Sequence, residues 1–196
     1  MKNSLRHKII YGFLRISAPS IYRNITTNRQ VMMVEFIKKR YGDKGLIGCE
    51  VGVYQGEHAK IMLERLNIYQ LVLIDPYLPF KDVGIDVDPS ETFKIAENAV
   101  APYKDKVCFT KFRSIDAAKT LANESLDFCY IDANHEYDYV KQDIEAYYPK
   151  VKAGGVLGGH NFEFMCQGVI RAVSEFILAT GLSLYVESHD WWVIKK

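Results

Sequence analysis

Apolar residues follow two different spacings along this chain, and the two spacings alternate. Short continuous runs such as "LIGCEV" and "LDFCYI" are separated by segments in which apolar residues return every three or four positions, as in "RQVMMVEFIKKRY". A continuous run bounded by turn residues is typical of a strand buried on both faces, whereas the longer spacing predicts a helix with one buried face. The pattern therefore predicts alternating strands and helices.

The bounds of the predicted elements follow from these spacings. Strands are expected at residues 46–53, 71–77, 107–112, 126–132 and 154–160. Helices are expected at residues 29–41, 56–66, 91–100, 117–122, 139–151 and 168–180. Residues 78–89 are rich in Pro, Gly and Asp and predict a long loop, after which Ser90 is expected to cap the next helix.

The C-terminus predicts a hairpin, because "LSLYVES" and "WWVIKK" are separated only by the turn residues "HD". Alternating strands and helices predict an open parallel sheet with right-handed crossovers. The expected fold class is therefore α/β. It is a Rossmann-like, doubly wound, mostly parallel seven-stranded sheet with a C-terminal antiparallel hairpin and helices on both faces.

The N-terminal segment "MKNSLRHKIIYGFLRISAPS" has only a short apolar piece, and Arg15 follows it at once. A secretory signal has a longer apolar core, so we expect an amphipathic helix here, and no run is long enough to span a membrane. A length of 196 residues without repeats or linkers favours one domain. We divide it into a helical extension at 1–44 and a core at 45–196.

Net charge and cysteine content indicate which partners and which cellular compartment to expect. The formal net charge is +1 with acids and bases interleaved, which argues against a nucleic-acid partner because such proteins carry a basic patch. Four cysteines lie far apart without a C-x-x-C pair, and three sit in apolar runs. This distribution predicts reduced core thiols and a cytoplasmic location. The sequence leaves open whether the chain forms a homodimer.

Asp132 ends the fourth predicted strand, and His135 follows three residues later. An ionisable side chain without a partner is costly inside a strand, but ligands bind such sheets at the carboxyl ends of the strands. Asp132 and His135 are therefore candidate site residues. The alternatives are a helix cap for Asp132 and a surface position at the start of the next helix for His135.

Two glycines mark the turn after the first strand, in "EVGVYQGE". Gly52 and Gly56 let backbone amides meet a ligand, unless they only build a structural turn. The spacing matches no phosphate-binding motif, and Glu50 suits a ligand that carries an ammonium group. Asp75 ends the second strand, where a carboxylate accepts the hydroxyls of a ribose; Pro76 follows it, which argues against the alternative of a helix cap.

The stretches "EVGVYQG", "LVLIDPY", "LDFCYIDANHEYDYVKQDIEAYYPKVKAGGVLGGHNF" and "GVIRAVSEF" together resemble a class I S-adenosylmethionine-dependent methyltransferase. The sequence is similar to the bacterial macrocin and macrolide-sugar O-methyltransferase group. The resemblance runs from about Gly45 to the end and leaves residues 1–40 unexplained. It implies S-adenosylmethionine as cofactor and a hydroxyl of a small molecule, a sugar or a phenol, as methyl acceptor.

The resemblance also implies a role for each matching position. Cofactor-binding residues are expected at Glu50, Gly52, Val53, Gly56, Asp75, Ser114 and Asp132. The turn from Glu50 to Gly56 would hold the methionine part, Asp75 the ribose, and Ser114 would lie beside the adenine. Asp132 would sit near the sulfonium, and His135 would be the general base. An imidazole suits that role because its ordinary pKa, about 6.5, lets it accept a hydroxyl proton at neutral pH.

The segment "GGHNF" after the fifth strand departs from the resemblance. Metal-dependent relatives place one or two acids here, whereas this chain has His160 and Asn161. With Asp132 these residues are a candidate site for a divalent metal, but Mg²⁺ prefers oxygen ligands, and His160 supplies neither oxygen nor negative charge. Dependence on Mg²⁺ is therefore doubtful, and His160 is equally a candidate second base or substrate contact.

Two competing functions remain at this stage. An NAD-type oxidoreductase also has an acid at the end of its second strand, although the missing glycine fingerprint and the terminal hairpin argue against it. A non-catalytic cofactor-binding module is the other alternative, because a fold does not guarantee chemistry. Tyr77 and Phe162 each follow a site residue and are candidates for stacking on an acceptor, with core packing as the alternative.

Overall fold

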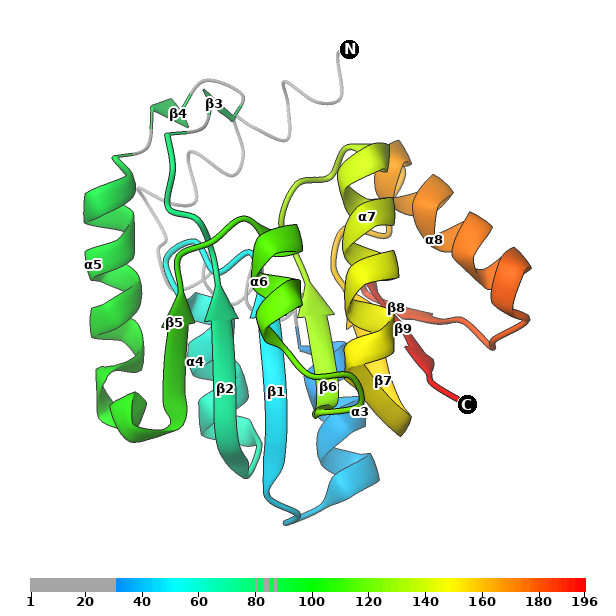
Figure 1. The fold of residues 1–196 in the computed structure, drawn as a ribbon, viewed down its shortest axis with the longest axis horizontal. Coiled ribbons are helices and arrows are strands. Elements are labelled where there is room, and N and C mark those ends of the chain that lie inside the picture. Colours follow the sequence, from blue (N-terminus) through cyan, green and yellow to red (C-terminus); the bar gives the residue numbers. More distant parts are fainter. Residues whose placement is uncertain (1–30, 80, 83–84, 87) are drawn as a thin grey trace.

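A seven-stranded sheet runs through the part of the chain that the computed structural model describes, residues 31–79, 81–82, 85–86 and 88–196 (Figure 1). The strands are β1 (Leu46–Val51), β2 (Ile68–Ile74), β5 (Val107–Thr110), β6 (Leu126–Ile131), β7 (Val151–Gly159), β8 (Tyr185–Glu187) and β9 (Asp190–Ile194). Their order is β5-β2-β1-β6-β7-β9-β8, and only the pairs of β9 with β7 and β8 are antiparallel. The predicted mostly parallel sheet with a C-terminal hairpin is confirmed.

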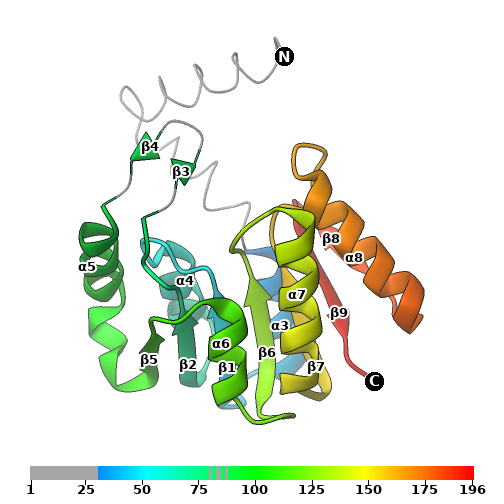
Figure 2. The same ribbon diagram turned by 45° about the horizontal axis from the view of Figure 1, so that its top comes forward.

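Helices cover both faces of this sheet (Figures 1 and 2). One face carries α3 (Met32–Tyr41), α4 (Glu57–Arg65) and α5 (Pro89–Val100). The other face carries α6 (Ser114–Thr120), α7 (Tyr137–Tyr147) and α8 (Gln167–Thr180). Short 3-10 turns, η1 (Ala101–Lys106) and η2 (Tyr148–Lys150), lead into β5 and β7. The helix expected near residues 9–14 lies outside the described residues.

The central strands explain why the apolar runs are continuous. Every residue of β6 is buried, because helices pack on both faces of the sheet. The charged member of this strand, Asp127, has its own partners: its carboxylate accepts hydrogen bonds from Lys44 Nζ at 2.9 Å and from the backbone N–H of Ile47 at 2.9 Å. The strand therefore buries an acid only where donors reach it.

α3 belongs to the packed core, although the sequence placed it in the N-terminal extension. Met33, Val34 and Ile37 are buried in the cluster on the α4 side of the sheet. Their spacing on one helical face is the feature that predicted this helix. Residues 32–41 are thus structurally continuous with the sheet.

Two local predictions were wrong for identifiable reasons. Asp88, not Ser90, caps α5: its carboxylate accepts hydrogen bonds from the backbone N–H groups of Ser90 and Glu91, because Pro89 occupies the first helical turn. The terminal turn consists of Ser188 and His189, whose φ angles of 48° and 78° suit a two-residue hairpin turn, so Asp190 begins β9.

Several element bounds also differ from the sequence prediction: β2, expected at 71–77, covers Ile68–Ile74, and α6, expected at 117–122, covers Ser114–Thr120. β7 starts at Val151, a residue that the sequence assigned to the preceding helix. The loop predicted at 78–89 contains two short antiparallel strands, β3 (Lys81–Asp82) and β4 (Ile85–Asp86). Boundaries of this kind depend on pairing with other strands, which local spacing does not contain.

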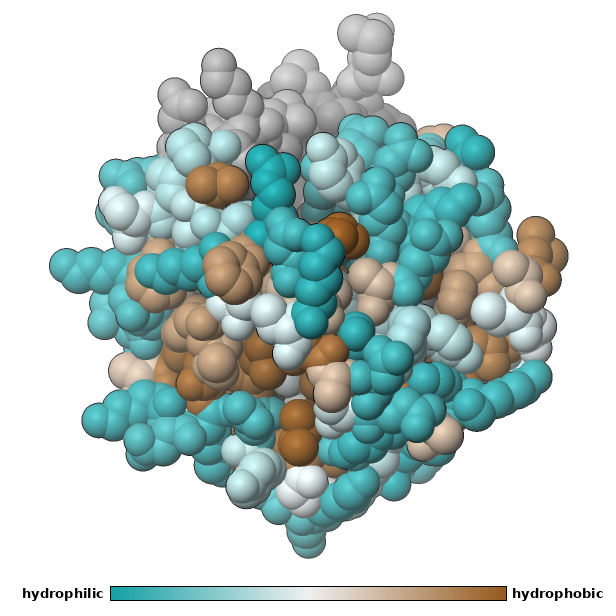
Figure 3. All heavy atoms as spheres, viewed as in Figure 1, coloured by the Kyte–Doolittle hydropathy of each residue, from teal (hydrophilic) through white to brown (hydrophobic). Residues whose placement is uncertain are grey.

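The four cysteines are free thiols in three environments, and Cys166 is partly buried. Cys49 and Cys129 are buried partners on neighbouring strands β1 and β6, as the sequence predicted. Cys108 is exposed on the edge strand β5, so the prediction of a core thiol was wrong there. In Figure 3 hydrophobic colour gathers on the side of β5 and β2, while most of this face is hydrophilic. Among the described residues, no helix has the length and apolar character needed to cross a membrane.

Candidate active site

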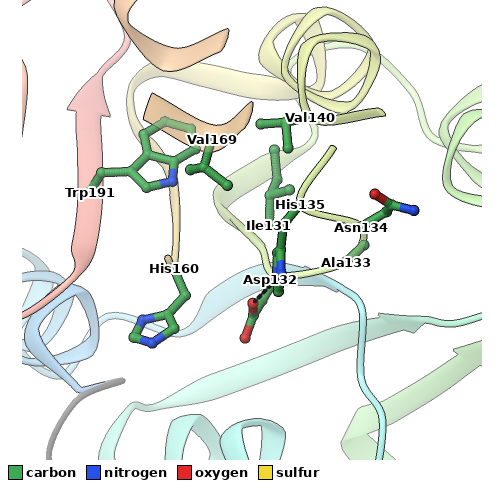
Figure 4. A pocket seen from close by; sticks show the side chains of 9 residues that line it. All are labelled: Ile131, Asp132, Ala133, Asn134, His135, Val140, His160, Val169 and Trp191. Carbon is green, nitrogen blue, oxygen red and sulfur yellow. Dashed lines mark hydrogen bonds and ion pairs between the residues drawn. The ribbon is translucent and has the colours of Figure 1, made fainter. Parts of the chain in front are cut away.

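A pocket lies at the carboxyl ends of β6 and β7 and brings both predicted catalytic residues together (Figure 4). Its lining residues are Ile131, Asp132, Ala133, Asn134, His135, Val140, His160, Val169 and Trp191. Val140, Val169 and Trp191 lie at one end of the view, while the side chains of Asp132 and His160 extend toward the other. The pocket thus combines an apolar wall with an acid and two imidazoles.

Asp132 and His135 contact each other across the loop between β6 and α7. The ring Nε2 of His135 lies 3.4 Å from Oδ1 of Asp132, and the two side chains are 44% and 18% exposed. Asn134 accepts the backbone N–H of Glu136 at 2.8 Å, so Asn134 rather than Asp132 supplies the local turn bond at the start of α7. The pair therefore lies at a solvent-accessible strand end, where sequence analysis expected it.

His160 has a buried carboxylate behind it, which sequence analysis did not find. Its Nδ1 lies 2.8 Å from Oδ1 of Asp190, a fully buried residue at the start of β9. Asp190 also accepts hydrogen bonds from the hydroxyl of Tyr130 at 2.9 Å and the backbone N–H of Met33 at 3.0 Å. Because Nδ1 is engaged, Nε2 is the ring nitrogen that a ligand in the pocket can meet.

The turn between β1 and α4 requires its first glycine. Gly52 has a φ of 90°, and a Cβ at this position would lie 2.1 Å from the carbonyl oxygen of Asp132. Any side chain would therefore push the turn away from the end of β6. Gly56, with φ 75°, is the left-handed residue directly before α4. Both glycines predicted from the sequence thus have a structural reason to be there.

Glu50 lies at the end of β1 below this turn and is only 1% exposed. Its Oε1 lies 2.7 Å from Nδ1 of His58, whereas Oε2 is buried without a hydrogen-bond partner among the described residues. Burial raises the pKa of Glu50, and the hydrogen bond from His58 opposes that effect. His58 is a site residue that the sequence analysis missed, although it stands two positions after Gly56 in the same motif.

The side chain of Asp75 fixes the same turn by accepting hydrogen bonds from backbone N–H groups. Its Oδ2 accepts the N–H groups of Val53 at 3.0 Å and Tyr54 at 2.9 Å, and its Oδ1 accepts the N–H of Tyr77 at 2.8 Å. A carboxylate offers about four acceptor positions, so the donors from the described residues leave about one for a ligand hydroxyl. The alternative of a helix cap is wrong, because these donors belong to the β1–α4 turn and to the segment after β2.

Ser114 lies outside the pocket around His135. It is the first residue of α6, its carbonyl accepts the hydroxyl of Tyr147 at 2.7 Å, and its side chain lowers the pKa of Asp143 against the effect of burial. Phe162 packs partly buried against the core. Tyr77 has a buried hydroxyl without a partner among the described residues, and burial followed by the charge of Asp75 raises its pKa.

The donor set for a metal fits Mg²⁺ poorly. Asp132 supplies one carboxylate, His160 supplies a nitrogen, and the side-chain amide of Asn161 donates toward Sγ of Cys166 at 3.7 Å. Within residues 31–196 as far as they are described, no three His, Cys, Asp or Glu side chains gather in a group able to hold a metal. Mg²⁺ sites are built mainly from oxygen ligands, so these three residues do not make a site suited to this ion.

Comparison of the sequence with family models gives a match over residues 49–162 to a family described as a methyltransferase domain. The chain belongs to this methyltransferase family. The matched range includes the end of β1 and all of β2 and β6, and it contains Glu50, Asp75 and Asp132. Methyltransferases of this fold use S-adenosylmethionine, and the oxidoreductase alternative gains no support from the comparison.

Solved methyltransferase structures share the fold. The O-methyltransferase NovP is 19% identical, with a TM-score of 0.60 over 84% of this chain and 79% of that one. CalS11, a TDP-rhamnose 3′-O-methyltransferase, is 14% identical, with a TM-score of 0.62 over 93% and 86%. A Staphylococcus aureus structure described as a caffeoyl-CoA O-methyltransferase is 14% identical, with a TM-score of 0.63 over 98% and 100%. No curated protein matches the chain by sequence.

Three residues from the ends of β1 and β2 and the start of α4 fit such a cofactor. Glu50 Oε2, His58 Nε2 and the hydroxyl of Tyr77 are buried polar atoms without partners among the described residues. Buried polar atoms are rarely left unpaired in folded proteins, so each calls for a ligand or a water. S-adenosylmethionine supplies an electrophilic methyl group on a sulfonium, together with ammonium, carboxylate and hydroxyl groups for such atoms.

Proposed function

We propose that this chain transfers a methyl group from S-adenosylmethionine to a hydroxyl group of a small molecule, a sugar or a phenol. The observation that supports the proposal best is the pocket in which Asp132, His135 and His160 meet at the carboxyl edge of the sheet. The likeness to NovP and CalS11 favours oxygen as the methylated atom. The macrocin and macrolide-sugar group is the subfamily that we assign on the sequence motifs.

The proposed reaction is a direct displacement. A carbon–oxygen bond forms between the acceptor and the methyl group, the carbon–sulfur bond breaks, and the hydroxyl proton leaves to a base. His135 is the proposed base because it lines the pocket and contacts Asp132 at 3.4 Å. Asp132 is proposed to orient this ring and to lie beside the sulfonium. Such a site works by alignment and proton removal, without a covalent enzyme intermediate.

Cofactor binding is assigned to the two turns at the ends of β1 and β2. We propose that the turn from Glu50 to Gly56 holds the methionine part and that Asp75 meets the ribose with its remaining acceptor position. Ser114 is proposed to lie beside the adenine at the start of α6. Residues 45–196 then form the cofactor-binding core, and residues 1–44 act with the 78–89 segment in choosing the acceptor.

The test replaces each pocket histidine separately. Release of S-adenosylhomocysteine is measured with a panel of sugars, catechols and simple phenols. His135→Ala should lower the rate about 10²- to 10⁴-fold, as for loss of general-base assistance, while S-adenosylhomocysteine binds as before. Tyr69→Ala is the control, because this side chain is 73% exposed at the start of β2, the end of the strand opposite to the pocket. It should keep the parent rate.

Two outcomes would contradict parts of this proposal. Full activity in His135→Ala together with lost activity in His160→Ala would make the imidazole held by Asp190 the base. Methyl transfer to amines or carboxylates, with no hydroxyl compound accepted, would exclude O-methylation while leaving the methyltransferase family untouched.

A further inference from the structure

Glu50 and His58 form a buried pair whose second member no part of the proposed reaction uses. Glu50 is 1% and His58 is 6% exposed, and their side chains meet at 2.7 Å. The imidazole also lies against the ring of Tyr130, with the ring centroids 4.0 Å apart. Strand β6 and the first turn of α4 thus fix the imidazole, and the imidazole fixes one oxygen of the carboxylate.

Both members of the pair keep one polar atom without a partner. Oε2 of Glu50 and Nε2 of His58 are buried and make no hydrogen bond among the described residues. Leaving a buried polar atom unpaired is strongly unfavourable, more so for a charged group, unless a ligand or water pairs with it. The two atoms flank the β1–α4 turn, so they point to a polar ligand group at this place.

The charges around the pair indicate the sign of that group. Among the described residues, the largest charge effects on Glu50 besides that of His58 come from Asp132 at the end of β6 and Asp75 at the end of β2. The largest on His58 besides that of Glu50 come from Asp190 on β9 and Asp132. All of these neighbours are carboxylates. Burial, which would lower the pKa of His58, is outweighed by the hydrogen bond and charge of Glu50, so the pKa of His58 is raised.

We propose that His58 is a positioning residue for the cofactor: it holds Oε1 of Glu50 so that Oε2 accepts the ammonium group of the cofactor's methionine part. A cationic group is the partner that this excess of carboxylates favours. Without His58 the carboxylate would have no hydrogen-bond partner among the described residues, and a buried acid of that kind favours its protonated, neutral form. His58 therefore opposes protonation of Glu50 and fixes the direction of its carboxylate. The inference rests on S-adenosylmethionine as the family's cofactor and is independent of the acceptor.

The test compares two ligands that differ at the methionine end. S-adenosylhomocysteine carries the ammonium and carboxylate groups, and 5′-methylthioadenosine lacks both. Calorimetric titration of the full chain should show that His58→Leu and Glu50→Gln each lower the affinity for S-adenosylhomocysteine about 10- to 100-fold, as for loss of a charged hydrogen bond. Binding of 5′-methylthioadenosine should change less than about threefold, which also shows that each variant is folded.

Further variants separate positioning from general damage. The double variant His58→Leu/Glu50→Gln should bind S-adenosylhomocysteine only slightly more weakly than Glu50→Gln alone, because both changes remove the same interaction. His58→Gln keeps an N–H donor and should recover part of the affinity, and it replaces His58→Leu as the test if that variant does not fold. Glu57→Gln, an acid exposed in the first turn of the same helix, is the matched control and should change neither affinity.

The inference is overturned if His58→Leu or His58→Gln binds S-adenosylhomocysteine as tightly as the parent. An equal loss of affinity for both ligands would also overturn it. A purely structural role of His58 would weaken binding of the nucleoside part as much as binding of the ammonium group. If the parent binds neither ligand, the cofactor assignment fails, and this inference fails with it.

Discussion

At the scale of single residues, the carboxylates at the ligand-binding edge of the sheet have different partners and therefore different tasks. Asp75 accepts three backbone N–H groups, and Asp190 accepts donors from α3, β6 and β7. Within the described part of the chain, Glu50 has His58 as hydrogen-bond partner of one oxygen and no partner for the other, and Asp132 lines the pocket. Asp75 and Asp190 therefore stabilise the backbone and side chains around the site, whereas Glu50 and Asp132 are placed to contact a ligand.

A buried acid away from the pocket gives a stability test. Asp143 on α7 is buried, and burial raises its pKa to about 6 from 3.8, against the hydrogen bond of Ser114. The folded state thus binds this proton more tightly than the unfolded state. The resulting stabilisation is present below about pH 4 and is lost as the pH rises to about 6.

Asp143→Asn should remove this pH dependence, because the amide is neutral at every pH and its oxygen still accepts the Ser114 hydroxyl. We expect the free energy of unfolding to rise by about 1 to 3 kcal/mol at about pH 7.5. Urea denaturation at about pH 5 and about pH 7.5 measures both effects. A variant less stable than the parent at the higher pH would contradict the prediction.

At the scale of elements, close backbone contacts set the position of the loops that carry the site. The N-terminus of α8 packs on the loop between β6 and α7, and a Cβ at Gly168 would lie 2.3 Å from the carbonyl oxygen of His135. The same Cβ would lie 2.6 Å from the backbone nitrogen of Tyr137. Helix packing therefore holds the backbone of His135 in place.

Gly168→Ala should move this loop and lower the methyl-transfer rate about 10- to 100-fold, because small misplacements of a catalytic group are costly. The affinity for S-adenosylhomocysteine should stay within about threefold, since the β1–α4 turn is a separate element. Leu178→Ala, at an 84% exposed position of the same helix, is the control and should be neutral. Loss of affinity without loss of rate would contradict this account.

At the scale of the whole molecule, the site exists only when distant parts of the chain meet. Glu50 comes from β1, Asp132 from the end of β6, His160 from the end of β7, and Asp190 from the terminal hairpin. A cofactor that contacts these elements binds the folded chain and has little affinity for the unfolded one. Cofactor binding is therefore coupled to global stability.

S-adenosylhomocysteine at about 100 times its dissociation constant should stabilise the fold by about 2.7 kcal/mol. For a chain of this size the melting temperature should rise by about 5 to 10 °C, and NAD at the same concentration should leave it unchanged. Differential scanning fluorimetry with both ligands measures the difference. A larger shift with NAD would contradict the family's cofactor for this chain.

The order of strands and helices was predictable because it depends on local spacing. Runs such as "LDFCYI" predict buried strands wherever they stand, and Asp132 and His135 follow such a run directly. The cap at Asp88 and the turn at Ser188 and His189 were assigned one or two residues away from their true positions. There Pro89 and the pairing register of β8 with β9 decide the geometry, and both act beyond the single residue.

By itself, the sequence determined the α/β fold, the candidate turn from Glu50 to Gly56, and the pair at the end of β6. Only the tertiary structure decided which side chains stand behind these residues. His58 turns toward Glu50 because α4 packs against β1, and Asp190 reaches His160 because β9 pairs with β7, thirty residues later in the chain. Hydrogen-bond partners are set by distance in space, whereas hydrophobic spacing reports only which face of an element is buried.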